Sequence, residues 1–156
     1  MKKVLFILVA VMGFAFAANA QNNLGVRLGA GSYGGGAEVS WQKVVGTDNR
    51  FELDFGFNGI FNAADVYRFV SVTGIYQWHW YIVDKFGWFV GPGATFGFYP
   101  DYESSKFGVA VGGQIGIDYE FPIPLQLSLD VRPMWNLLGA YTGIGWGACL
   151  GIRYMF

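Results

Sequence analysis

Histidine and cysteine, two side chains often used in nucleophilic catalysis, each occur once in this sequence. His79 is the sole histidine, so histidine-based catalysis would have to use it. Ser104 and Ser105 lie in the segment 99–106, where no nearby histidine stands ready to activate a serine hydroxyl. Cys149 is the single cysteine, and no second cysteine or neighbouring histidine accompanies it as a metal ligand. The sequence predicts no catalytic residue, no metal site and no cofactor.

A glycine run, Gly34-Gly35-Gly36, is the only segment that suggests a phosphate-binding loop. Such a loop needs a helix to follow it, because the helix N-terminus supplies the N–H groups that bind the phosphate. The residues after Gly36 alternate as a strand does. We therefore predict a turn at 34–36.

The charged residues form a larger set. Three cations and six anions fall on the polar side of alternating segments: Arg27, Glu38, Glu52, Asp54, Asp118, Glu120, Asp130, Arg132 and Arg153. If that side faces the interior of a barrel, each charge needs a partner or trapped water in a low-dielectric space. We expect a structural network that closes the interior. A conducting path lined by the same groups is the alternative.

The elements that would position these side chains are β-strands. Leu125, Leu127, Leu129 and Val131 alternate with polar residues at a period of two, and the segments 51–58, 107–120 and 146–156 behave likewise. Weaker alternation fills the gaps between them. The expected strands are 24–31, 37–45, 50–58, 66–82, 88–98, 107–120, 125–135 and 143–156.

The segment 66–82 has the least regular alternation. Ile75 falls on its polar side, and Arg68 falls on its apolar side. A long arginine side chain at the end of a strand can reach the lipid headgroups while its stem stays in apolar surroundings. We expect Arg68 to do so.

The N-terminus reads as a secretory signal peptide covering residues 1–20. Lys2 and Lys3 form a basic region, residues 4–17 are apolar, and Ala18-Asn19-Ala20 is a cleavage site. The mature chain, 21–156, then has eight basic and eleven acidic residues and a net charge of −3, which argues against nucleic-acid binding. An exported chain with one cysteine cannot form an internal disulfide.

The composition suits a membrane better than water. Charged residues make up 13% and aromatic residues 19% of the chain, whereas soluble domains average about 25% charged residues. Beyond the signal peptide, one uncharged stretch, residues 133–152, is long enough to span a bilayer. It holds a proline and five glycines, which disfavour a helix. A closed β-barrel is the other structure that satisfies its backbone groups inside a bilayer.

Two kinds of β-barrel have strands in which apolar and polar side chains alternate in this way. A soluble, lipocalin-like barrel has its apolar face inward around a ligand and many lysines and glutamates outside. Here the polar face is mostly Gly, Ser, Thr and Gln, which suits a narrow lumen with no room for large side chains. The bulky face would then contact lipid. Tryptophans expected at the membrane interfaces are Trp41, Trp78, Trp80, Trp88, Trp135 and Trp146.

The last strand ends at Phe156, with Leu150, Ile152 and Tyr154 alternating before it. This resembles the C-terminal signature of bacterial outer-membrane proteins, which the barrel-assembly machinery recognises. With the signal peptide and the strand count, the mature chain resembles the OmpX-like barrels and the transmembrane domain of OmpA. The resemblance implies an eight-stranded antiparallel up-and-down barrel with a plugged polar interior, in the outer membrane, with both termini in the periplasm.

The resemblance also bears on function. It implies a non-enzymatic membrane-structural or surface-interaction role, with outer-membrane lipids, the assembly machinery and a surface or envelope protein as partners. The expected external loops are shorter than those of OmpX, so a protruding adhesive sheet is not expected. Two alternatives stay open, a lipid A-modifying enzyme and a narrow small-solute pore. The lipid A deacylases among such barrels use a His-x-Ser pair, but His79 is followed by Trp80-Tyr81.

Overall fold

The computed structural model describes residues 22–32, 34–59, 68–98, 107–139 and 142–156. The predicted signal peptide at 1–20 lies outside the described residues, as do Ser104 and Ser105. No helix in the described part of the chain is long and apolar enough to cross a membrane.

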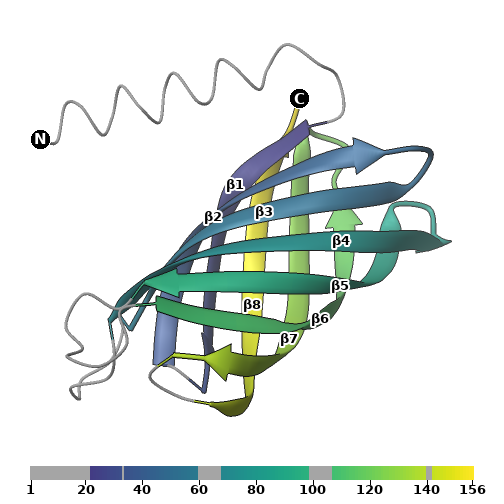
Figure 1. The fold of residues 1–156 in the computed structure, drawn as a ribbon. Helices are drawn as coiled ribbons and strands as arrows, with labels where there is room; N and C mark the ends of the chain where they lie inside the picture. Colours follow the sequence, from purple (N-terminus) through teal and green to yellow (C-terminus); the bar gives the residue numbers. More distant parts are fainter. Residues whose placement is uncertain (1–21, 33, 60–67, 99–106, 140–141) are drawn as a thin grey trace, which may run out of the picture.

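Eight strands close into one antiparallel barrel (Figure 1). They are β1 (Asn22–Gly31), β2 (Gly34–Val45), β3 (Asn49–Asn58), β4 (Phe69–Val83), β5 (Phe86–Phe98), β6 (Phe107–Glu120), β7 (Leu125–Leu138) and β8 (Gly143–Met155). Each strand pairs with the next along the chain, and β1 pairs with β8 to close the sheet. The predicted eight-stranded up-and-down barrel is confirmed.

The period of two sends alternate side chains to opposite faces of this sheet. In β7, Gln126, Ser128 and Asp130 are buried in the lumen, whereas Leu129 and Val131 are exposed on the outside. Ile75 in β4 is also buried, on the inward side where its place in the sequence put it.

The lumen holds large side chains, so the expectation that it has no room for them was wrong. The largest fully buried side chains include Arg27, Arg153 and Phe89. Glycines on neighbouring strands make room for such groups. A Cβ added at Gly116 would lie 2.6 Å from the Phe89 ring, so the absence of a side chain there is what admits the ring.

Three strand boundaries differ from the sequence prediction by three residues, and the others differ by two residues or fewer. The glycines 34–36 do not form a turn, because they begin β2 and pair with residues 29–31 of β1. Strand β7 continues past residue 135 to Leu138, where a register shift at Val109 and Ala110 accommodates two consecutive apolar residues. Arg68 is exposed and lies just before β4 instead of within it.

The connectors divide between the two ends of the barrel. The end that holds both chain termini, which we call the terminal end, has the short connections 46–48, 84–85 and 121–124. The opposite end has connections 32–33, 59–68, 99–106 and 139–142. Two of these four, the β3–β4 and β5–β6 connections, are longer than any connection at the terminal end.

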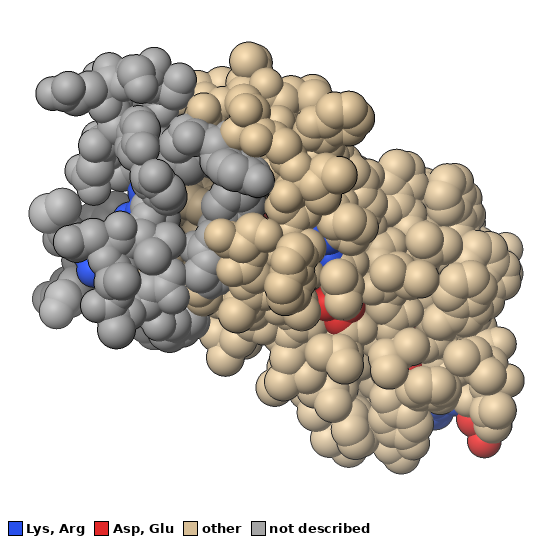
Figure 2. Space-filling model, turned by 90° about the horizontal axis from the view of Figure 1, so that it is seen from below, with Lys and Arg blue, Asp and Glu red and all other residues tan. Residues whose placement is uncertain are grey.

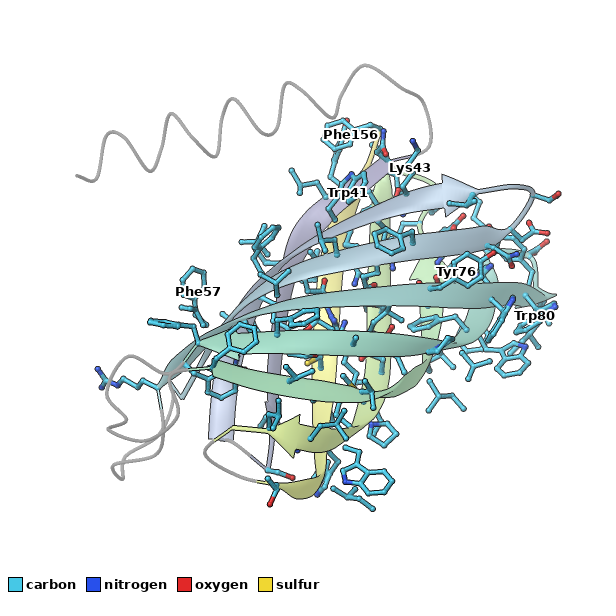
Figure 3. The ribbon with its side chains drawn as sticks, viewed as in Figure 1. Trp41, Lys43, Phe57, Tyr76, Trp80 and Phe156 are labelled. Carbon is cyan, nitrogen blue, oxygen red and sulfur yellow. The ribbon has the colours of Figure 1, made fainter. Side chains whose placement is uncertain are left out.

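The outer face is almost free of charge. On the face drawn in Figure 2 the described surface is nearly all uncharged, with small groups of coloured atoms near its centre, at one edge and beside the grey residues. Figure 3 shows Phe57 toward one end of the barrel and Trp41, Tyr76 and Trp80 toward the other, all on the outside. Such a surface has the character of one that contacts hydrocarbon.

Candidate functional site

Polar side chains from seven strands meet across the middle of the lumen, with Glu52 of β3 at their centre. Its carboxylate accepts hydrogen bonds from Arg27 at 3.0 Å, from Arg153 at 2.8 Å and from Arg132. Three glutamine amides from β2, β4 and β6 donate to the same carboxylate, at distances of 2.6 to 3.2 Å: Gln42, Gln77 and Gln114. Glu52 is fully buried.

Three further carboxylates complete this group. Arg27 donates to Glu38 at 3.0 Å, to Asp54 at 2.8 Å and to both oxygens of Asp130 at 2.6 Å. Arg132 donates to Glu38 at 3.2 Å and to Asp54. We call these seven charged residues the central cluster: Arg27, Glu38, Glu52, Asp54, Asp130, Arg132 and Arg153.

A second group lies in the lumen toward the terminal end. Arg50 forms ion pairs with Asp118 and, at 2.9 Å, with Glu120. His79 is buried beside them, with its Nε2 atom 3.0 Å from Asp118 and 3.3 Å from Arg50. We call Arg50, His79, Asp118 and Glu120 the terminal cluster.

All nine charged residues expected to face inward therefore do so, but they form two groups rather than one. Sequence reasoning missed Arg50 and the convergence of three glutamines on Glu52. The signal for Arg50 was present, because it directly precedes Phe51 and so falls on the polar side of that alternation. The glutamines lie at inward positions too, and only their convergence on one carboxylate required the structure.

The half of the lumen farther from the chain termini contains a cavity. A cavity of about 120 Å³ lies between the central cluster and the end opposite the termini, and we call it the vestibule. Glu38 and Arg132 contribute its charged lining. The uncharged polar lining is Asn58, Ser71, Thr73, Thr95 and Asn136, and most of the remaining wall is glycine and alanine.

His79 and Cys149, the residues considered for catalysis, both face the interior of the barrel. His79 faces the lumen, is 2% exposed, and has a T-shaped contact with Tyr81 at 4.7 Å. Cys149 faces inward and lines the vestibule. Among the described residues, no group of three or more His, Cys, Asp and Glu side chains is arranged to hold a metal ion.

The tryptophans expected at membrane interfaces lie on the outer face toward both ends of the barrel. Trp41 pairs with Leu24 near the start of β1, and Trp80 stacks on Trp88 at 4.9 Å near the β4–β5 connection. Trp78 lies on the same half of β4. Trp135 and Trp146 lie toward the opposite end.

The C-terminal residues lie where their alternation predicts. Leu150, Ile152 and Tyr154 are exposed on the outer face of β8. The backbone N–H of Phe156 donates to the carbonyl of Asn22 at 2.9 Å, which ties the end of the chain to β1. The Phe156 ring has a T-shaped contact with Tyr154.

Comparison with known proteins finds this architecture among bacterial membrane proteins. The chain is similar to outer membrane protein H (OprH) from P. aeruginosa, with a TM-score of 0.70 and 17% identity over 88% of this chain and all of that one. It is also similar to Neisserial surface protein A (NspA), with a TM-score of 0.63 and 15% identity over 87% of this chain and 95% of that one.

A third similar structure is the N-terminal β-barrel domain of Pseudomonas aeruginosa OprF, with a TM-score of 0.59 and 15% identity over 88% of this chain and all of that domain. No family model matches the sequence, and no curated relative matches it. The likeness is therefore one of fold. The chain has the fold of the small eight-stranded outer-membrane β-barrels.

Proposed function

We propose that this protein resides in the bacterial outer membrane as a plugged, non-enzymatic barrel with a membrane-structural or surface-interaction role. The apolar outer face and the inward charges support the membrane location, since a water-facing barrel would reverse them. In the proposed orientation, both termini lie in the periplasm and the 59–68 and 99–106 connections face outward.

The observation that carries the proposal is the central cluster. Glu52 of β3 binds arginines from β1, β7 and β8, and glutamines from β2, β4 and β6 reach the same carboxylate. The remaining strand, β5, contributes the buried Phe89 ring. Side chains from all eight strands thus occupy the lumen, and an eight-stranded barrel has little interior space beyond its side chains.

The same observation weighs against a narrow pore. An ion crossing the lumen would have to displace paired charges that have few other partners, at a large cost in a low-dielectric space. The lipid A-modifying alternative is weakened by His79, which faces the lumen and contacts Asp118 instead of lying on the lipid face.

Insertion is proposed to depend on the barrel-assembly machinery reading the exposed C-terminal residues Leu150, Ile152, Tyr154 and Phe156. Outer-membrane lipids would surround the tryptophan-rich ends. A surface or envelope protein is the proposed partner of the external connections.

The proposal is tested by fractionating cells that express the full chain and comparing its gel mobility in SDS before and after boiling. Closed barrels keep their structure in SDS until they are heated. We expect the protein in the outer-membrane fraction, with a mobility shift on boiling. A soluble periplasmic protein without such a shift would contradict the membrane location.

Replacing His79 with alanine distinguishes the proposed non-enzymatic role from that of a lipid A-modifying enzyme. A lipid A-modifying enzyme that uses this histidine would lose its effect on lipid A composition. We expect the lipid A profile of cells expressing the native protein and the H79A variant to be the same by mass spectrometry. A modified lipid A present only with the native protein would overturn the non-enzymatic assignment.

A further inference from the structure

The vestibule has the features of a binding site for a small cation. The first of these is charge. The central cluster combines three guanidinium groups with four carboxylates, so it carries one net negative charge when all are ionised. An unbalanced charge inside a low-dielectric lumen is costly, and a bound cation would remove that cost.

Glu38 is where this unbalanced charge meets the vestibule. Its Oε2 atom accepts from both Arg27 and Arg132, but no described residue donates to its Oε1 atom. Its side chain is 14% exposed, more than that of any other acid in the central cluster. Glu38 also lines the cavity.

Two asparagines that line the vestibule supply side-chain amide groups to it. The amide nitrogen of Asn58 donates to Ser71, and that of Asn136 donates to the carbonyl of Gly143. These bonds use one N–H of each amide, and the side-chain carbonyl oxygens of both asparagines remain available as acceptors. The terminal nitrogens of Arg132 point to carboxylates. Its buried Nε atom lies 3.8 Å from Asp130 and has no hydrogen-bond partner among the described residues.

From this charge, these acceptors and the small volume, we propose that the vestibule binds a small primary ammonium ion, with Glu38 as its counter-ion and the amide oxygens of Asn58 and Asn136 as further acceptors. An ammonium group carries three donors and no acceptor, which complements this lining. A cavity of about 120 Å³ limits the ligand to a few heavy atoms beyond the ammonium group.

The test uses the refolded full-length mature barrel in detergent micelles, with amide NMR shifts followed as ethylammonium chloride is added. We expect saturable shifts at the residues lining the vestibule, such as Gly31, Gly145 and Gly147, and none in the terminal cluster. Ethanol, a neutral molecule of similar size, and potassium chloride at equal ionic strength should not reproduce them. These comparisons need no variant of the protein.

Two variants sharpen the result. Glu38→Gln should weaken ethylammonium binding at least about tenfold, the factor that corresponds to 1.4 kcal/mol. Gly147→Leu should abolish binding by filling the cavity, because an added Cβ there meets no heavy atom closer than 3.9 Å. The matched control is Glu120→Gln, which removes an inward carboxylate at the other end and should leave binding unchanged.

Three outcomes would overturn the proposal. Shifts of the same size with potassium chloride would reflect general electrostatics, and saturable shifts with sodium formate would assign the vestibule to anions through Arg132. The absence of any saturable shift with ethylammonium would mean that a proton, and not a ligand, balances the central cluster.

Discussion

Removal of the Glu52 carboxylate is expected to destabilise the barrel through one particular arginine. Arg27 and Arg132 retain Asp54 and Glu38 as partners when Glu52 is replaced by alanine. Arg153 does not, because its other donors reach only the hydroxyls of Ser40 and Ser128.

The size of the effect follows from this orphaned charge. Arg153 is 1% exposed, and leaving a buried charge without its partner costs about 3–5 kcal/mol. We expect E52A to lower the free energy of unfolding by about that amount. Adding Arg153→Met should recover part of the loss, because it removes the unpaired charge while keeping much of the side-chain volume.

The assay is reversible unfolding by urea in short-chain phospholipid vesicles, followed by tryptophan fluorescence and by the gel mobility of unboiled samples. The matched control is E120Q, which removes a carboxylate of 22% side-chain exposure at the rim and should cost no more than about 1 kcal/mol. A loss below about 1 kcal/mol for E52A, or a double variant less stable than E52A, would refute the reasoning.

Three further predictions concern the outer face, the lumen wall and assembly. Leu129→Arg, at mid-height on the outer face, should lower the free energy of unfolding by about 2–4 kcal/mol in the same assay. Ile123→Arg, in a terminal-end connector, should lower it by less than about 1 kcal/mol. Equal costs would contradict the placement of the membrane. Gly116→Ala should lower the free energy of unfolding by about 1–3 kcal/mol, because its Cβ would lie 2.6 Å from the backbone oxygen of Leu129. Gly74→Ala should leave stability close to unchanged, because the added Cβ has no heavy atom nearer than 3.8 Å. An unchanged stability for G116A would contradict the packing. Phe156→Ala should lower the amount of heat-modifiable protein in the outer-membrane fraction of cells more than it lowers the yield of refolding in detergent, and equal effects would argue against a role in assembly.

The strand count, pairing order and inward face could be predicted because alternation acts locally. Each strand carries its own period of two, and every pairing except the β1–β8 closure joins strands that are consecutive in the chain. The prediction went wrong where local rules compete. The run Gly34–Gly36 suggested a turn by composition, yet small residues suit the crowded inner wall of a tightly curved strand equally well.

The site was less predictable than the fold. Alternation identified the inward charges, but their division into two clusters depends on register across strands, which places Arg50 beside Asp118 and Arg27 beside Asp130. The vestibule also emerges only in three dimensions, because glycines from separate strands leave space at one height of the lumen. Phe89 occupies the lumen for the same reason, since Gly116 on the neighbouring strand leaves it room.

Conductance across a planar bilayer tests the occluded lumen most directly. The refolded native protein would be inserted at known amounts, with insertion verified by its gel mobility before boiling and a general porin as positive control. The central cluster predicts no discrete current steps at moderate voltage. Regular steps of uniform size from the native protein would show an open path through the barrel and would contradict the proposed plug.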